Sequence, residues 1–262
     1  ASRKLSFSAS KTMSVVQGLY EGVNVGKGGH TGLVTYIRTD STRISDEAAA
    51  AAKAHILKEY GEAYLPKSKR VFKNKNAAQD AHEAIRPTHI EFTPAEVKDK
   101  LTNDQYKLYK LIYERFIASQ MADAVYDVCT VDFDVSGHTF RSIGSSVKFA
   151  GFTKLYEETL DDNTDNDNSK IPQLEISEKV IVDSILPEQH FTQPPARYTE
   201  ATLVKALEEN GIGRPSTYAP TISVIQSRGY VGKEKKSLYP TELGRVVNDL
   251  MKNSFSDIVN VE

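Results

Sequence analysis

The stretch GLVTYIRTDSTR (32–43) carries Tyr36 and, two residues later, Arg38. The tyrosine could attack a phosphodiester with the arginine beside it. The β-branched run predicts a strand, in which both side chains project to the same side. A phenol with a pKa of about 10 is ionised only about 0.1% at pH 7, so it is a poor nucleophile unaided. A guanidinium beside it would favour the phenolate and bind the phosphate under attack. The pair fits formation of a phosphotyrosine, although on composition alone a structural tyrosine is the simpler interpretation.

A histidine and an arginine form a second candidate pair, in the segment NAAQDAHEAIRPT (76–88). This segment predicts a helix that ends before Pro87, because the residue before a proline avoids the helical region. On such a helix His82 and Arg86 stand four residues apart on one face and could bind one anion together. An exposed helix with an ordinary polar pair explains the same spacing.

The connector NGIGRPST (210–217) joins two predicted helices and carries a possible phosphate site. It places Arg214 and Thr217 at the N-terminus of the second helix, where free backbone N–H groups attract phosphate. Arg228 follows eleven residues after Thr217, three turns along the same face. Ordinary helix capping by Ser216 or Thr217 is the alternative, and two helices joined by a glycine turn are a weak signal of DNA binding.

The acidic stretches do not predict metal sites. Asp132 and Asp134 alternate with apolar residues in a predicted strand, which indicates a solvated strand face. Residues 161–172 begin with calcium-loop spacing, but the sixth position is Asn166 rather than Gly and the twelfth is Pro172 rather than Glu.

The composition limits the class of protein. The chain has 262 residues, 39% of them hydrophobic, and a net charge of -2, so any nucleic-acid site is a local patch. The single cysteine, Cys129, excludes an internal disulfide framework and thiolate metal clusters. No run approaches the roughly 20 apolar residues of a membrane helix. Because the chain opens on Ala1 and stops at Glu262 without a helix-ending signal, we expect a piece of a larger intracellular protein.

The predicted elements change character along the chain, from helical to β and back to helical. Periodicity and capping signals predict helices over 8–21, 46–60, 76–86 and 94–121, with Ser45 as the N-cap and Gly61 as the stop of the second. They also predict a hairpin over 126–144 with SGHT (136–139) as its turn; strands around 147–156 and 179–187; and helices over 200–209, 217–228 and 241–252. Two or three compact units are therefore expected.

Three blocks of the sequence together resemble the central part of a bacterial type IA DNA topoisomerase. They are TYIRTDSTRIS (35–45), AHEAIRPT (81–88) and PPARYTEATLVKALEENGIGRPSTYAPTISVIQSRGYV (194–231), in the family's order. The resemblance runs over nearly the whole chain. It implies an α+β multi-domain fold, with residues 1–121 as a mainly helical domain that bears the tyrosine, 122–193 as part of a β arch domain, and 194–262 as part of a helical DNA-binding domain.

The resemblance also implies roles for the candidate residues. Tyr36 matches the nucleophile that becomes linked to the 5′ phosphate, and Arg38 matches the arginine that positions the tyrosine and the phosphate. His82 matches a histidine associated with DNA binding near the cleavage site, and Arg86 belongs to the same motif.

Further residues are expected along the path of the DNA. Arg214, Thr217 and Arg228 fall at positions that line the single-stranded DNA path in the family. Arg197 and Lys205 are expected to be their neighbours.

The implied activity is the breakage and rejoining of one DNA strand, which relaxes negative supercoils. In the family Mg²⁺ is bound by an N-terminal Toprim domain, which this sequence lacks, so we expect no metal in this fragment and no relaxation by the fragment alone. We expect a monomer that binds single-stranded DNA in the cytoplasm, associated with the nucleoid, and no membrane partner. Two alternatives stay open: a single-stranded DNA-binding module without chemistry, and a decatenating enzyme of the topoisomerase III type.

Overall fold

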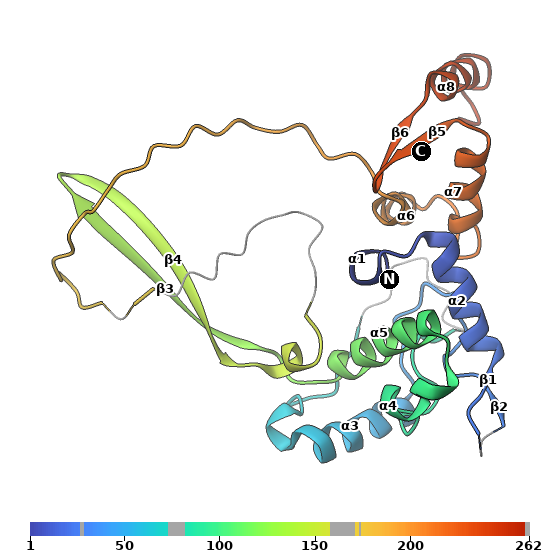
Figure 1. Ribbon diagram of the computed structural model, residues 1–262, viewed down its shortest axis with the longest axis horizontal. Coiled ribbons are helices and arrows are strands. Elements are labelled where there is room, and N and C mark those ends of the chain that lie inside the picture. The colour runs from blue at the N-terminus through green and yellow to red at the C-terminus, as the bar shows by residue number, and fades with distance from the viewer. Residues whose placement is uncertain (27–28, 73–81, 158–170, 173, 260–262) are drawn as a thin grey trace.

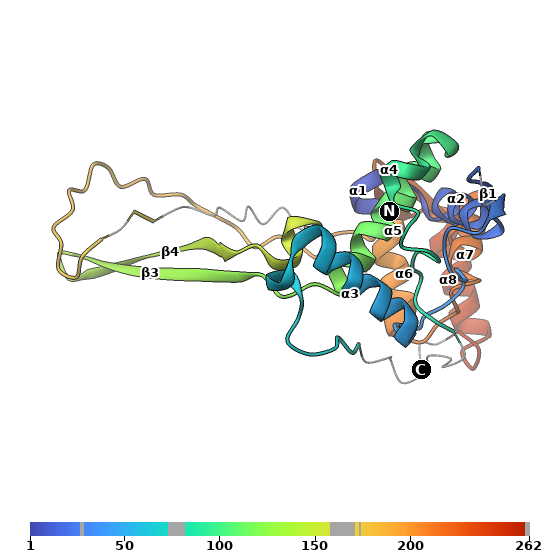
Figure 2. The same ribbon diagram turned by 90° about the horizontal axis from the view of Figure 1, so that it is seen from below.

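The structure is a computed structural model that describes residues 1–26, 29–72, 82–157, 171–172 and 174–259. A helical body carries one long β-hairpin that projects away from it (Figures 1 and 2). The elements are α1 (Ser2–Leu5), α2 (Ala9–Glu21), β1 (Val23–Asn24), β2 (His30–Thr31), α3 (Asp46–Tyr60), η1 (Glu62–Tyr64), α4 (Pro94–Val97), η2 (Lys98–Lys100), α5 (Asn103–Ser119), β3 (Val125–Val135), β4 (His138–Phe149), η3 (Gly151–Lys154), α6 (Glu200–Glu209), α7 (Tyr218–Ser227), β5 (Val231–Glu234), β6 (Ser237–Pro240) and α8 (Glu242–Ser254). Helices combined with separate two-stranded antiparallel sheets make this an α+β protein, as predicted.

The first helical part of the body is built around α2 and α5, which contact each other. Ser8 caps α2 by accepting a hydrogen bond from the Lys11 N–H, and the predicted cap Ser45 does the same for α3 through Ala48. The core is apolar, and its fully buried side chains include Leu19, Leu33, Ile56, Ile117 and Met121. Capping and burial of one helix face explain why the predictions for 8–21 and 46–60 are confirmed.

The predicted single helix over 94–121 is wrong, because the chain forms α4, η2 and α5 in succession. Thr102 starts α5 anew with a capping box: its hydroxyl accepts from the Gln105 N–H, and the Gln105 side chain accepts from the Thr102 N–H. The capping box therefore starts a separate helix within a segment whose apolar spacing predicted a single one.

The hairpin prediction is confirmed, and the strands are longer than expected. β3 pairs with β4 antiparallel, with Val135 opposite His138. The turn is only Ser136–Gly137, both at positive φ (55° and 83°), which suits the twist of a two-residue hairpin turn. His138 and Thr139, expected in the turn, already belong to β4.

Of the two further strand predictions, the one around 147–156 holds only for residues 147–149, which are the end of β4, and the one over 179–187 is wrong. After Phe149 the chain forms η3, where a Cβ on Gly151 (φ 50°) would collide with the backbone carbonyl of Asp123. Residues 179–187 are exposed and form no strand, because no other described segment pairs with their backbone. They belong to an extended segment that returns from the region of the hairpin to α6 (Figure 1).

The C-terminal part contains α6, α7 and α8, which confirms the three predicted helices. A small hairpin, β5 and β6, lies between α7 and α8 and was not predicted. α7 contacts α2, so α2 is shared between the two helical parts of the body (Figure 1). Among the described helices, none has the length and apolarity needed to cross a membrane.

Candidate active site

Tyr36 lies at the surface of the body between two other aromatic side chains. Its side chain is 37% exposed. The His82 ring is stacked on it, with 5.0 Å between ring centroids and 25° between ring planes. The Tyr20 ring meets it edge-on, at 5.7 Å and 70°. The structure therefore brings together the two residues that the sequence placed in separate motifs, Tyr36 and His82.

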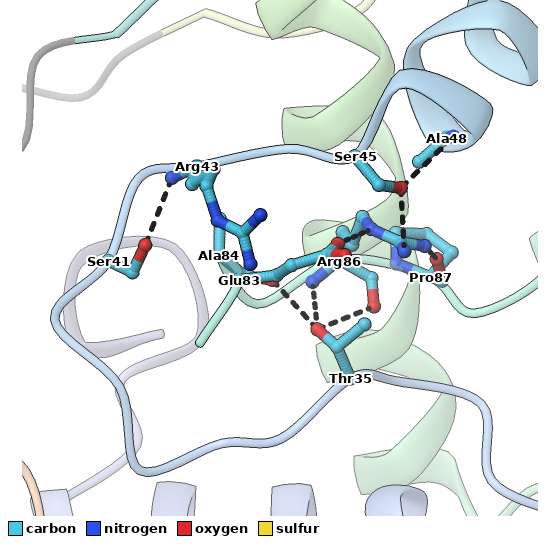
Figure 3. Close-up of polar contacts among 9 residues, drawn as sticks. All are labelled: Thr35, Ser41, Arg43, Ser45, Ala48, Glu83, Ala84, Arg86 and Pro87. Carbon is cyan, nitrogen blue, oxygen red and sulfur yellow. Dashed lines mark hydrogen bonds and ion pairs between the residues drawn. The ribbon is translucent and has the colours of Figure 1, made fainter. Parts of the chain in front are cut away.

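Thr35 attaches the Tyr36 segment to the segment that carries His82 (Figure 3). The Thr35 N–H donates to the Arg86 carbonyl at 3.0 Å. The Thr35 hydroxyl donates to the Ala84 carbonyl at 2.8 Å and accepts from the Arg86 N–H at 3.0 Å. Thr88 adds a fourth bond through its hydroxyl to the Gly32 carbonyl, at 2.6 Å. These contacts fix the relative position of the two motifs.

The predicted strand and helix at these motifs are both corrected. Residues 32–38 form only an isolated bridge, Val34 to Pro87, rather than a strand. Residues 82–88 are not helical, and 76–81, where the helix was predicted to begin, lie outside the described residues. The backbone groups of each segment bond to the other segment, which removes them from helical bonding. His82 and Arg86 consequently do not share a helix face.

Arg86 points its charge into the protein. Its side chain is only 13% exposed and donates to the Glu83 carboxylate at 2.8 Å and to the Pro87 carbonyl at 2.9 Å. A third contact reaches the Ser45 hydroxyl at 3.5 Å (Figure 3). These internal acceptors occupy the guanidinium, so the structure does not place it beside Tyr36 and His82.

Arg38 has the opposite character. It is exposed, and no hydrogen bond or ion pair joins it to another residue within the described ranges. Ile37, between Tyr36 and Arg38, is buried in the core at 4% exposure. The buried Ile37 holds the turn of chain from which Tyr36 and Arg38 both extend to solvent, where a guanidinium is available to an anionic ligand.

Two other tyrosines show what an inert phenol looks like in this fold. Tyr109 and Tyr113 are buried, and their hydroxyls donate to the Phe92 and Ile90 carbonyls at 2.6 and 2.8 Å. Burial is the main cause that raises the pKa of both phenols well above the usual value, and neighbouring groups add to it. Raised pKa values and occupied hydroxyls make these two poor nucleophiles, in contrast to the exposed Tyr36.

The candidate DNA-contacting residues of the C-terminal part are exposed but spread along α7. Arg214 and Thr217 precede the helix, and Thr217 is the N-cap residue without a side-chain cap hydrogen bond, so the alternative of side-chain capping by Thr217 is wrong. The Thr217 hydroxyl instead accepts from the Arg214 N–H at 2.9 Å, because the GRPST turn closes on itself. Arg228 lies at the far end of α7, about 15 Å away for ten helical residues. Arg197 is exposed in the extended segment before α6.

A cavity of about 330 Å³ separates the Tyr36 segment from the C-terminal helices. Ile37, Thr39 and Asp40 line one side, and Pro215 and Tyr218 line the other. The RTDS and GRPST motifs therefore face each other across this cavity, although about 175 residues separate them in sequence.

Glu200, at the start of α6, connects the two sides next to this cavity. Its carboxylate accepts from the Ala9 N–H of α2 at 2.8 Å and from Lys233 of β5 at 2.6 Å. Burial alone raises the pKa of Glu200, but the Lys233 hydrogen bond, the Ala9 N–H and the Lys233 charge outweigh it and hold that pKa below its usual value.

The hairpin carboxylates have local partners. Asp132 accepts two hydrogen bonds from Arg141, at 2.7 and 2.9 Å, and this contact lowers the pKa of Asp132. The Asp134 carboxylate accepts from the Gly137 N–H. Across the described part of the chain no group of three or more His, Cys, Asp or Glu side chains could hold a metal ion. The calcium-like segment 161–172 falls mostly outside the described residues.

Tyr20 and Glu200 belong to this site and had not been predicted. In the sequence, Tyr20 is one more apolar residue near the end of a predicted helix, and Glu200 is an ordinary acidic residue in the first turn of another. Neither carries a local signal, since each acts through a residue distant in sequence.

The model of the DNA topoisomerase family matches residues 1–262, and the chain therefore belongs to this family. The chain is also similar to the full-length topoisomerase I of Thermotoga maritima, with 40% identity and a TM-score of 0.81. That similarity covers 100% of this chain and 42% of the Thermotoga chain, so the present chain spans less than half the length of that relative. The resemblance to the bacterial type IA enzymes seen in the three sequence blocks is confirmed.

Proposed function

We propose that this chain supplies the nucleophile of a bacterial type IA topoisomerase I, which breaks and rejoins one DNA strand to relax negative supercoils. The observation that carries the proposal is the exposed Tyr36 ring stacked on His82, with Arg38 two residues away, exposed and without a bonded partner among the described residues. Tyr36 thus supplies the nucleophile, His82 a ring that supports it, and Arg38 a cation for the phosphate.

The proposed reaction is a transesterification. The Tyr36 phenol oxygen attacks a backbone phosphorus and forms a P–O bond, while the bond from phosphorus to the 3′ oxygen breaks. The products are a 5′-phosphotyrosine and a free 3′-hydroxyl. The phenol proton leaves to solvent or to a base outside this chain, and the leaving 3′ oxygen takes up a proton. Resealing reverses each step, with the 3′-hydroxyl as attacking group, so no external energy source is required.

Arg38 and His82 divide the supporting roles. The Arg38 guanidinium binds the non-bridging phosphate oxygens, whose negative charge increases as the phenol oxygen adds. The His82 ring restricts the Tyr36 ring and places a second polar group beside the phosphate. Arg86 acts from inside the protein by holding the His82 segment against Thr35.

The exposed Arg197, Arg214, Thr217 and Arg228 are proposed to contact single-stranded DNA as it approaches Tyr36. They extend over the length of α7 and the segment before α6, which matches a ligand several nucleotides long. We propose the partition of the chain as 1–121, 122–193 and 194–262, with the second part belonging to a β arch.

Magnesium enters only as a property of the complete enzyme. The described residues do not fit a metal site, so no step is assigned to a metal ion here. In the family the Toprim domain would supply Mg²⁺ and the groups that assist proton transfer. The proposal therefore includes that this chain alone does not relax DNA, and that the whole enzyme acts as a monomer at the nucleoid.

The test is trapping of the covalent intermediate in the complete topoisomerase. Tyr36→Phe removes the attacking oxygen and keeps the ring stack, so it is expected to abolish the 5′-linked adduct while DNA affinity stays nearly unchanged. Tyr126→Phe, at an exposed tyrosine on the hairpin, is the matched control. Adduct formation by Tyr36→Phe at the normal level would disprove the assignment.

A further inference from the structure

We propose that Tyr20 is a positioning residue for Tyr36, so that the nucleophile is held between two rings, those of Tyr20 and His82. This inference rests on the proposed function of Tyr36. Its direct observation is the edge-on contact of the Tyr20 and Tyr36 rings, with centroids 5.7 Å apart and planes at 70°. Edge-to-face geometry at 4.5–7 Å is the arrangement that aromatic quadrupoles favour.

The backbone fixes Tyr20 relative to the nucleophile segment. The Leu33 N–H donates to the Leu19 carbonyl at 2.8 Å, one residue before Tyr20. A Cβ on Gly32 would lie 2.6 Å from the Tyr20 carbonyl oxygen, closer than such atoms approach, so only glycine allows the two segments this near. Leu19 and Leu33 are themselves completely buried. The end of α2 is therefore attached to the chain three residues before Tyr36.

His82 is fixed on its side by an independent set of bonds. Thr35 carries them, through the Ala84 carbonyl and both backbone groups of Arg86. Tyr36 thus has a neighbouring ring from each of two segments, and each segment is bonded separately to residues 32–35. An exposed tyrosine otherwise exchanges between rotamers, and each excursion removes the phenol oxygen from the line of attack.

The exposure of Tyr20 makes a direct DNA contact the competing explanation. Its side chain is 37% exposed, as is that of Tyr36, so a nucleobase could stack on it. The two roles differ in what they change. Positioning alters the rate of the bound complex, whereas stacking on a base alters DNA affinity.

The experiment uses the complete topoisomerase and an end-labelled single-stranded oligonucleotide in single turnover. Tyr20→Leu removes the ring and keeps an apolar side chain, while Tyr20→Phe keeps the ring without the hydroxyl. At saturating DNA we expect Tyr20→Leu to slow adduct formation by about 3- to 10-fold, the size of one aromatic contact. Tyr20→Phe should keep the normal rate, the Kd for the oligonucleotide should stay unchanged, and Tyr126→Leu serves as control.

Two results would overturn the inference. If Tyr20→Leu forms the adduct at an unchanged rate, positioning is excluded. If the rate at saturating DNA is unchanged but the Kd for the oligonucleotide is larger, Tyr20 contacts DNA instead. The unfolding midpoint of each variant is measured as well, because a lowered midpoint for Tyr20→Leu would show a general loss of structure rather than a loss of Tyr36 positioning. Tyr36→Phe is measured in parallel. If Tyr36→Phe still forms the adduct, the proposed function fails. If Tyr36→Phe forms no adduct but Tyr20→Leu forms it at the normal rate, only the role of Tyr20 is rejected.

Discussion

Thr35 and Arg86 exchange two hydrogen bonds: the Thr35 N–H donates to the Arg86 carbonyl, and the Arg86 N–H donates to the Thr35 hydroxyl, both at 3.0 Å. Through this exchange a residue adjacent to the candidate nucleophile is joined to the segment that presents His82. The tyrosine and the histidine are therefore positioned by a small set of polar contacts around Thr35 rather than by a shared helix or sheet.

Removing the Thr35 hydroxyl tests this contact. Thr35→Val leaves the Arg86 N–H and the Ala84 carbonyl without their partner, so we expect the free energy of unfolding to fall by about 1–3 kcal/mol. Thr35→Ser keeps the hydroxyl and should lose much less. Denaturant unfolding of both variants provides the measurement, and equal stability of the two would show that the hydroxyl is unimportant.

Arg214 tests the path of the DNA. It is exposed on the turn before α7, and Arg214→Ala should weaken single-stranded DNA binding regardless of base sequence. The slope of log K against log salt should become shallower by about 0.7, the value for one phosphate contact to a single strand. Lys58→Ala removes an equal charge from α3 and should leave the slope as it is. An identical salt slope for Arg214→Ala and the unaltered protein would remove Arg214 from the interface.

Glu200 predicts a pH dependence of stability. The pKa of Glu200 in the folded chain lies below the ordinary 4.5. Its contribution to the free energy of unfolding is therefore complete above about pH 4.5 and is lost as the pH falls through its pKa in the folded chain. Glu200→Gln should therefore be less stable than the unaltered chain at pH 7, and the difference should narrow below pH 4.5. Glu209→Gln, at the exposed end of the same helix, is the matched control. A difference that stays constant from pH 7 to pH 3 would contradict this origin.

Local signals predicted much of the fold. Ser45 and Gly61 correctly delimit α3, and the hairpin was predicted with its turn at SGHT (136–139), of which only Ser136 and Gly137 form the turn. Such features depend on residues within one or two turns of each other, which a sequence displays directly.

The errors arose where the partner of a backbone group is distant. Residues 32–38 have strand composition, yet their backbone bonds go to Leu19 and to residues 84–88, with only one isolated bridge between Val34 and Pro87. The segment around His82 has helical composition, but the described part is held open by Thr35. The chemistry of Tyr36 could be proposed from its motif, whereas the ring contacts of Tyr20 and His82 depend on tertiary packing.

The projecting hairpin has a mechanical consequence. β3 contains 11 residues, which corresponds to an arm of about 36 Å at the rise of an antiparallel strand, so a rotation of about 10° at its base displaces its tip by about 6 Å. The base is where Gly151 packs against the backbone of Asp123 and where no larger residue fits. A small rotation at this one close contact would therefore move the hairpin tip much further than its base.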